Sequence, residues 1–395
     1  MSSTVSASAR PAWLALDKLG VLIAAIAAAG AAFPFALFRA NRIVPGDTVS
    51  LAAALPPVLA IVLALTLLAG FLVALLRFPV RAKLLVGFVV LATLFVLMGR
   101  SAAFLTPEGN SFARVSPGAG FWLLVFAFAL LVTDALTRLR LRPSARIAIL
   151  LAVIAAMALL LWSGGWNQLS LLKEYANRAP AFWTEAQTHL VLAFGSVAIA
   201  TLVGVPLGIV CYRVRPLRAG VLNVLNIIQT IPSIALFGLL IAPLAWIAAN
   251  VPGASAIGIS GIGTAPALLA LFAYSLLPIV SNTVVGLTSV SPAAVDAARG
   301  MGMTGWQRLV AIEVPLGFPV ILTGIRIVLV QNIGLTTIAA LIGGGGFGVF
   351  VFQGIGQTAM DLVLLGAVPT VALAFAAAVV LDALVELSSR EGQRS

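Results

Sequence analysis

Residues 291–315 read SPAAVDAARGMGMTGWQRLVAIEVP and form a polar stretch between two long apolar runs. Ser291, followed by a proline, is typical of a helix start, because serine caps an N-terminus and proline fits the first turn. Gly302 predicts the end of this helix. Thr304 and Gln307 have the spacing of a capping box, which predicts a second short helix. The stretch therefore predicts a compact helix–turn–helix, with an ordinary amphipathic connector as the alternative interpretation.

The composition around this stretch excludes a soluble protein. Of 395 residues, 62% are hydrophobic and 9% are charged, whereas a soluble domain has about 45–50% apolar and about 25% charged residues. The fold class that remains is all-α, a polytopic helical membrane protein. Ten apolar runs approach or reach the length of a membrane span, and they lie at about 19–38, 51–76, 84–99, 119–136, 147–163, 189–212, 220–249, 264–289, 317–344 and 362–388.

The chain has one cysteine and one histidine, which excludes most metal-site and disulfide chemistry. Cys211 excludes a disulfide framework, and with one histidine, His189, no metal site built on Cys or His is expected. We interpret Cys211 as a small apolar side chain and His189 as a residue at the membrane interface. An integral-membrane enzyme is disfavoured for the same reason.

The basic residues predict the orientation of the chain. With the N-terminus in the cytoplasm, sixteen Lys and Arg residues fall in inside connections and six in outside connections, while Arg326 lies within a span. This excess predicts that both termini are cytoplasmic. Membrane orientation therefore explains the net charge of +11. The expected partner is membrane lipid and not nucleic acid.

Two features of the sequence indicate that the energy for transport comes from outside this chain. All twelve Asp and Glu residues fall in connections or near the ends of the predicted spans, whereas ion-coupled carriers usually keep a carboxylate within the membrane. The sequence has no G-x-x-x-x-G-K-[ST] run, so any ATPase is expected on a separate polypeptide.

Residues 291–315 also carry a resemblance. They fit the spacing of the E-A-A-x3-G-x9-I-x-L-P coupling motif of permease subunits from ATP-binding-cassette (ABC) importers, with two departures, Asp296 for Glu and Val314 for Leu. We call this stretch the coupling loop. The positions carried over as ATPase-coupling residues are Asp296, Ala297, Ala298, Gly302, Ile312 and Pro315.

The resemblance covers about residues 188–388 and is closest to the glycine betaine/choline-type osmoprotectant permeases. The runs that carry it are 226–233, 263–266, 277–283, 297–303 and 342–348. It implies a type I importer core in residues 185–388, with cytoplasmic coupling helices at 291–314. Residues 1–184 are expected to form an N-terminal membrane extension of about five helices, and 389–395 a cytoplasmic tail.

Polar residues in the second-half spans are candidates for the translocation path, with helix packing as the alternative. They are Gln229, Pro232, Ser281, Asn282, Gln331, Asn332 and Thr336. Asn332 and Thr336 share a helix face. Gly343, Gly344, Gly345 and Gly346 are interpreted as an outer gate. Arg326 lies 11 residues past Pro315, about 16 Å along a helix, and we favour a structural role because a fixed cation would repel a quaternary ammonium.

The sequence therefore predicts the permease subunit of an ABC importer in a bacterial inner membrane, translocating an osmoprotectant such as glycine betaine or choline. The resemblance implies a cytoplasmic ATPase dimer, an external substrate-binding protein and a second permease subunit. ATP and Mg are expected on the ATPase, with no cofactor on this chain and no enzymatic activity of its own. The alternatives are an ABC permease for another small solute, such as an amino acid, and an ion-coupled secondary transporter.

Overall fold

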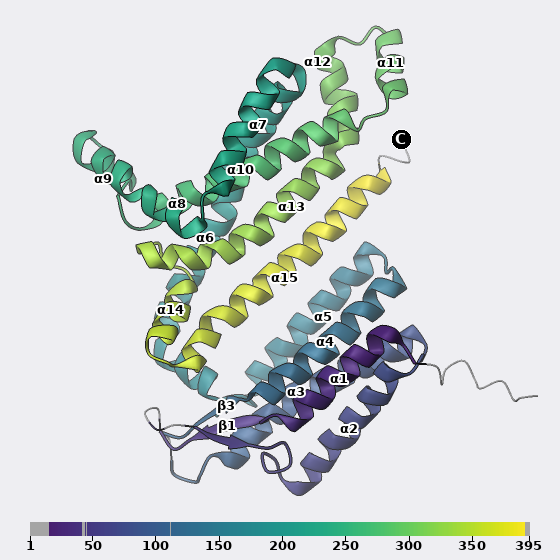
Figure 1. The fold of residues 1–395 in the computed structure, drawn as a ribbon, viewed down its shortest axis with the longest axis vertical. Helices are drawn as coiled ribbons and strands as arrows, with labels where there is room; N and C mark the ends of the chain where they lie inside the picture. Colours follow the sequence, from purple (N-terminus) through teal and green to yellow (C-terminus); the bar gives the residue numbers. More distant parts are fainter. Residues whose placement is uncertain (1–15, 42–43, 45, 111, 392–395) are drawn as a thin grey trace, which may run out of the picture. The chain divides into compact units, whose positions relative to one another are not determined.

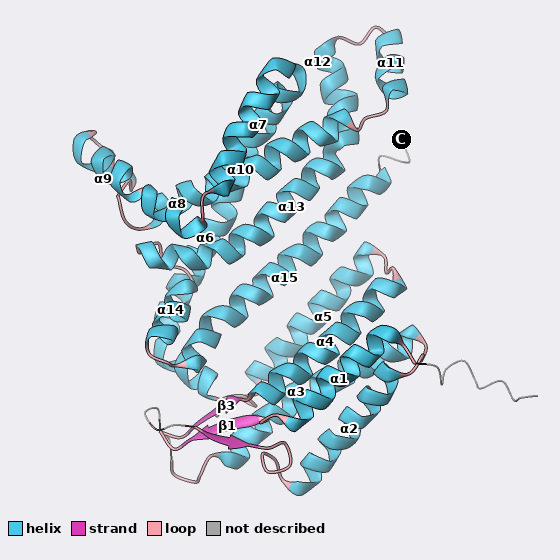
Figure 2. Cartoon of the chain, viewed as in Figure 1, coloured by secondary structure: helices cyan, strands magenta, loops and turns pink. Residues whose placement is uncertain are grey.

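The structure is a computed structural model that describes residues 16–41, 44, 46–110 and 112–391. The chain forms two compact units, which are described separately. The first unit contains residues up to Arg142 and residues 152–173, and the second contains residues 143–151 and those from Glu174 on. Helix dominates both (Figures 1 and 2). The expected division between residues 184 and 185 falls inside α6 (Ser170–Arg213), past a kink at Arg178, where the backbone leaves the helical conformation.

The first unit is a helical bundle with a small sheet. Its helices are α1 (Lys18–Ala32), α2 (Pro57–Leu75), α3 (Val80–Leu105), α4 (Ala119–Leu139) and the second half of α5 (Pro143–Trp162). Its core consists of large apolar side chains, among them the buried Phe121 and Phe128. Gly70 allows α2 to approach the Phe128 ring, because a Cβ there would lie 2.5 Å from a ring carbon.

The sheet was not predicted. Strands β1 (Ala36–Arg39), β2 (Asp47–Val49) and β3 (Arg114–Pro117) pair antiparallel in the order β2-β1-β3 and are drawn in magenta in Figure 2. The first predicted span, 19–38, was wrong at its end, because the helix stops at Ala32 and Phe33 is extended. Beyond that residue the backbone bonds to Val49 and to β3 instead of continuing the helix.

Among its described residues, the second unit contains most of α6, the first turns of α5 and nine further α-helices. These are α7 (Arg215–Thr230), α8 (Ser233–Leu239), α9 (Ile241–Asn250), α10 (Thr264–Thr288), α11 (Pro292–Gly300), α12 (Gly305–Arg308), α13 (Val314–Ala339), α14 (Gly348–Gly356) and α15 (Met360–Glu391). The predicted seventh span, 220–249, is broken into α7, α8 and α9. Pro232 stands at the first break and cannot supply a helical N–H.

The coupling loop folds as the sequence predicts (Figure 1). The Ser291 hydroxyl caps α11 by accepting from the Ala294 amide at 3.3 Å. Gly302 has a φ of +76°, a left-handed conformation that favours glycine at a helix end. Thr304 and Gln307 form the predicted capping box, with bonds of 2.8 and 3.3 Å. A π-helical segment, Leu309–Glu313, joins α12 to α13.

The membrane-span prediction is confirmed for nine of the ten predicted runs. In the part of the chain that the structure describes, nine helical stretches are long and apolar enough to cross a membrane, and α1 is a shorter apolar helix of 15 residues. Helix α3 is longer than the predicted run 84–99, because Lys83 and Arg100 are part of it.

Candidate functional site: the coupling loop and the polar contacts of the second unit

The coupling loop presents an exposed face made from α11 and the turn after it. Asp296 and Ala297 are exposed, whereas Ala298 is only 1% exposed and lies on the side of α11 that packs toward the π-helical segment. Two large apolar residues missed in the sequence, Met301 and Trp306, are 71% and 68% exposed. An exposed apolar patch on a short loop is typical of a surface that another protein covers.

The loop is anchored to the helices that follow and precede it. Glu313, 2% exposed, accepts from Arg308 Nε at 2.7 Å, so a partly buried ion pair ties the end of α12 to the end of the π-helical segment. Arg213, at the end of α6, donates to the Gly305 carbonyl. Ile312 is half-buried and Pro315 is exposed at the start of α13. These contacts hold the loop to α6 and to the segment that leads into α13.

Asn332 lies at a junction of three helices. Its side chain is 0% exposed, and its Nδ2 donates to Ser196 Oγ of α6 at 2.8 Å and to Ser275 Oγ of α10 at 2.9 Å. Thr336, also buried, donates to the Asn332 carbonyl one turn back. The neighbouring Gln331 is exposed. Asn332 and Thr336 therefore serve helix packing in this conformation, whereas Gln331 faces outward.

The remaining predicted path residues lie near two prolines, Pro232 at the break between α7 and α8 and Pro278 inside α10. Gln229 Nε2 donates to the Tyr274 carbonyl at 2.9 Å, and Tyr274 Oη donates back to the Ile231 carbonyl beside the exposed Pro232. Ser281 and Asn282 are half-buried, and both donate to the Pro278 carbonyl of their own helix. These bonds of Gln229, Ser281 and Asn282 all go to backbone carbonyls, and the role of these residues and of Gln331 in a path stays a prediction.

The glycine run is held in place by α6. Gly343, Gly345 and Gly346 have φ values of +75°, +77° and +86°, which glycine adopts without strain. The Gly346 amide donates to Glu185 Oε2 at 2.5 Å. Gly344 is buried. Whether this run acts as a gate stays a prediction, but the loop is fixed by a specific contact.

His189 secures the same loop. Its Nδ1 accepts from the Phe347 amide at 3.3 Å and its Nε2 lies 3.1 Å from the Ile333 carbonyl, which assigns the proton to Nε2. The residue is fully buried among its neighbours, and its interpretation as a residue at the membrane interface stays a prediction.

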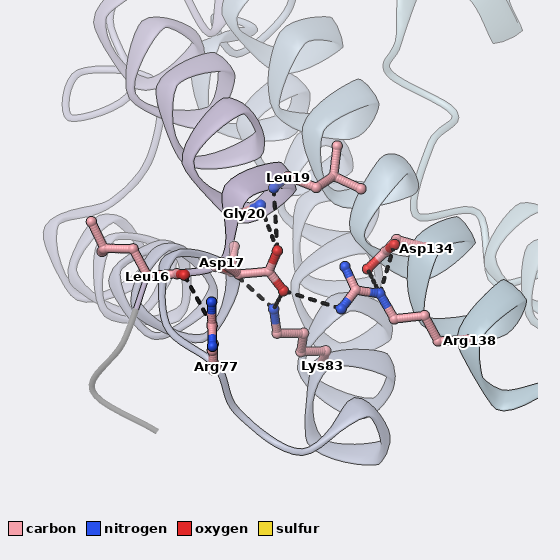
Figure 3. Close-up of polar contacts among 9 residues, drawn as sticks. Leu16, Asp17, Leu19, Gly20, Arg77, Lys83, Asp134 and Arg138 are labelled. Atoms are coloured by element: carbon pink, nitrogen blue, oxygen red, sulfur yellow. Dashed lines mark hydrogen bonds and ion pairs between the residues drawn. The ribbon is translucent and has the colours of Figure 1, made fainter. Parts of the chain in front are cut away.

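A charged cluster that the sequence did not predict lies in the first unit (Figure 3). Asp17 caps α1 and bonds to Lys83 Nζ of α3 at 2.8 Å, and Arg138 Nη1 of α4 lies 3.3 Å from the same carboxylate oxygen. Lys83 is 2% exposed. Arg138 also pairs with Asp134 at 2.8 Å. The cluster joins one end of α1, α3 and α4.

The pKa of Asp17 reports this pairing. Burial raises it, but the hydrogen bond and the charge of Lys83, with the Gly20 amide and the charge of Arg138, outweigh burial and lower the pKa of Asp17 to about 2. The carboxylate therefore stays ionised and paired.

Among the described residues, no group of three or more His, Cys, Asp or Glu side chains is placed to hold a metal ion.

Known families match both parts of the chain. Residues 17–172 match the N-terminal domain of the ABC transporter permease YehY, and residues 204–391 match the binding-protein-dependent transport system inner membrane component. The osmoprotectant import permease protein OsmW of Salmonella typhimurium is 45% identical over 197 residues, which are 50% of this chain and 85% of OsmW.

Two further proteins are similar over about half of this chain. The glycine betaine/carnitine/choline transport system permease protein OpuCB of Bacillus subtilis is 34% identical over 203 residues, which are 51% of this chain and 84% of OpuCB. A chain of the MetNI methionine ABC transporter, in an inward-facing conformation, has a TM-score of 0.46 at 22% identity, covering 53% of this chain and 95% of that one. The resemblance seen in the coupling loop is confirmed: the chain belongs to the binding-protein-dependent inner membrane component family and is a membrane-spanning permease subunit of an ABC importer.

Proposed function

We propose that this permease imports a small quaternary ammonium osmoprotectant, such as glycine betaine or choline. The named substrates of OpuCB, together with the 45% identity to OsmW, support this substrate class. An external binding protein delivers the substrate, and a second permease subunit, either a copy or a paralogue, completes the path.

The coupling loop supports the proposed energy source. A cytoplasmic ATPase dimer, which carries ATP and Mg, docks on the exposed face of α11 that includes Asp296, Ala297 and Met301. Closure of the ATPases moves α11, and the anchors Arg213–Gly305 and Arg308–Glu313 pass that motion to α6 and α13. This arrangement requires the coupling loop, and with it both termini, to face the cytoplasm, as the distribution of basic residues also favours. In this proposal the chain lies in the inner membrane of a bacterial cell.

Uptake of radiolabelled glycine betaine tests the proposal. The chain is expressed with its ATPase and binding protein in a host that lacks its own betaine transporters, with an ATPase-dead complex as control. We expect uptake that requires ATP hydrolysis and that unlabelled choline reduces. Absence of uptake, with the complex confirmed in the membrane, would contradict the substrate class, and amino acids are then the next solutes to test. Equal uptake by the ATPase-dead complex would contradict the energy source.

A substitution on the exposed face of α11 tests docking. Ala297→Asp places a charge on that face without filling the buried side, unlike a change at Ala298. We expect Ala297→Asp to reduce uptake about tenfold or more, because an unpaired charge buried in an interface costs more than about 1.4 kcal/mol. The matched control is Ala176→Asp, an exposed alanine at the start of α6. Equal uptake by the two variants, at equal amounts in the membrane, would rule out docking at this face.

A further inference from the structure

Four charged side chains meet in the second unit. Arg326 of α13 bonds to Asp382 Oδ1 of α15, and Arg146 Nη1 of α5 lies 2.6 Å from Asp382 Oδ2. Arg146 also bonds to Glu386, one turn further along α15. We call these four residues the inner charge cluster. Asp382 is its centre, because each of its carboxylate oxygens takes a different arginine.

The cluster explains how Arg326 is tolerated. Arg326 lies about 16 Å along the helix from Pro315, and a lone guanidinium within a span is costly. Two arginines and two carboxylates compensate one another in charge, and the planar guanidinium of Arg146 can bond both carboxylates of α15 at once. Asp382 and Glu386 are four residues apart and so share one face of α15.

The location of the cluster links it to the transport cycle. Arg326 belongs to α13, which begins at Val314 directly after the coupling loop. Arg146 belongs to the first turns of α5, and residues 143–151 are part of the second unit, although the rest of α5 is part of the first. Asp382 thus connects the helix that follows the coupling loop with a helix from outside the region of the inner membrane component match, residues 204–391.

We propose that Arg146 is a positioning residue of the importer: by holding Asp382, it keeps Arg326 and the α13 helix in register with α15, so that movement of the coupling loop is converted into substrate movement. This inference rests on the proposed ATP-driven import. Arg146 touches neither substrate nor ATP, and its effect is expected on the ratio of ATP hydrolysed to substrate moved.

The test compares Arg146→Gln with Arg142→Gln in the complete importer reconstituted in liposomes. Arg142 is an exposed arginine at the N-cap of the same helix. ATP hydrolysis and glycine betaine uptake are measured in the same vesicles. We expect Arg146→Gln to raise the ATP hydrolysed per substrate about fivefold or more, the lower end of usual coupling energies, while Arg142→Gln matches the unmodified complex. Because the ratio is taken on inserted complex, a loss of material alone leaves it unchanged.

Two further variants keep the test decisive. Arg146→Lys retains the charge but has no guanidinium fork, so an intermediate ratio is expected, and this variant carries the test if Arg146→Gln does not insert. If Arg146 acts through Asp382, Asp382→Asn combined with Arg146→Gln changes the ratio no more than Asp382→Asn alone. A ratio for both Arg146 variants equal to that of Arg142→Gln, or additive effects in the double variant, would overturn the inference. Failure of the unmodified complex to couple uptake to ATP would instead contradict the proposed function.

Discussion

The two units hold their helices together in different ways. In the first unit, large side chains such as Phe121, Phe128 and Met98 fill a single apolar core, and the Asp17–Lys83 ion pair fastens one end. In the second unit the apolar clusters are smaller, and polar side chains cross between helices, as Asn332 does to Ser196 and Ser275.

The difference in packing fits a rigid first unit and a second unit whose helices can move. A core of interdigitated large side chains has one well-packed arrangement and resists displacement. Small apolar contacts and a few directional hydrogen bonds keep helices in register. Each interhelical hydrogen bond in a membrane contributes only about 0.6 kcal/mol on average, so such helices can shift more easily. We therefore expect the first unit to behave as a rigid body and the second as the part whose helices shift during transport.

Breaking the ion pair of the first unit is expected to have the largest effect on stability. Asp17→Asn leaves the buried Lys83 ammonium without its partner, and removal of one member of a buried pair costs about 3–5 kcal/mol. The measurement is unfolding of the purified chain in detergent, followed by urea or heat.

The control is Asp134→Asn, which removes an exposed pairing with Arg138 and should cost about 0–1 kcal/mol. Combining Asp17→Asn with Lys83→Met should recover most of the loss, because the unpaired charge is then removed. Equal effects of Asp17→Asn and Asp134→Asn would show that the buried pair does not fasten this unit.

The same pair predicts a dependence on pH. The folded-state pKa of Asp17 is about 2, below its ordinary value of 3.8, so its contribution is fully present above about pH 4 and is lost as the pH falls through 2. That contribution is about 2 kcal/mol at neutral pH, at 1.36 kcal/mol for each pKa unit. Unfolding in detergent between pH 5 and pH 2 should show this loss in the unmodified chain and not in Asp17→Asn. Parallel curves for the two would contradict the assignment.

Local signals in the sequence predicted local structure well. The Ser291 cap, the Gly302 stop and the Thr304–Gln307 capping box each depend on residues within a few positions, and each formed as expected. The apolar runs likewise predicted nearly all spans, because the membrane requires length and low polarity.

Features that depend on distant partners were missed. Residues 36–39 continue an apolar run, and only pairing with β2 and β3 makes them a strand. Lys83 and its partner Asp17 lie 66 positions apart, so neither residue shows from the sequence that it pairs with the other. Asp382 and Arg326 are 56 positions apart, so neither residue shows from the sequence that it compensates the other.

A substitution at Asn332 tests whether the polar contacts of the second unit serve transport as well as stability. Asn332→Ala removes two interhelical hydrogen bonds and should cost about 1–2 kcal/mol, less than the loss of the first unit's ion pair. If these bonds keep moving helices in register, uptake should nevertheless fall about fivefold or more, because α6, α10 and α13 can then shift independently. The exposed neighbour Gln331→Ala is the control, with an expected cost below about 0.5 kcal/mol. Unfolding and glycine betaine uptake are measured on the same preparations. Unchanged uptake by Asn332→Ala at a measurable loss of stability would mean that the second unit also uses its polar contacts only for packing.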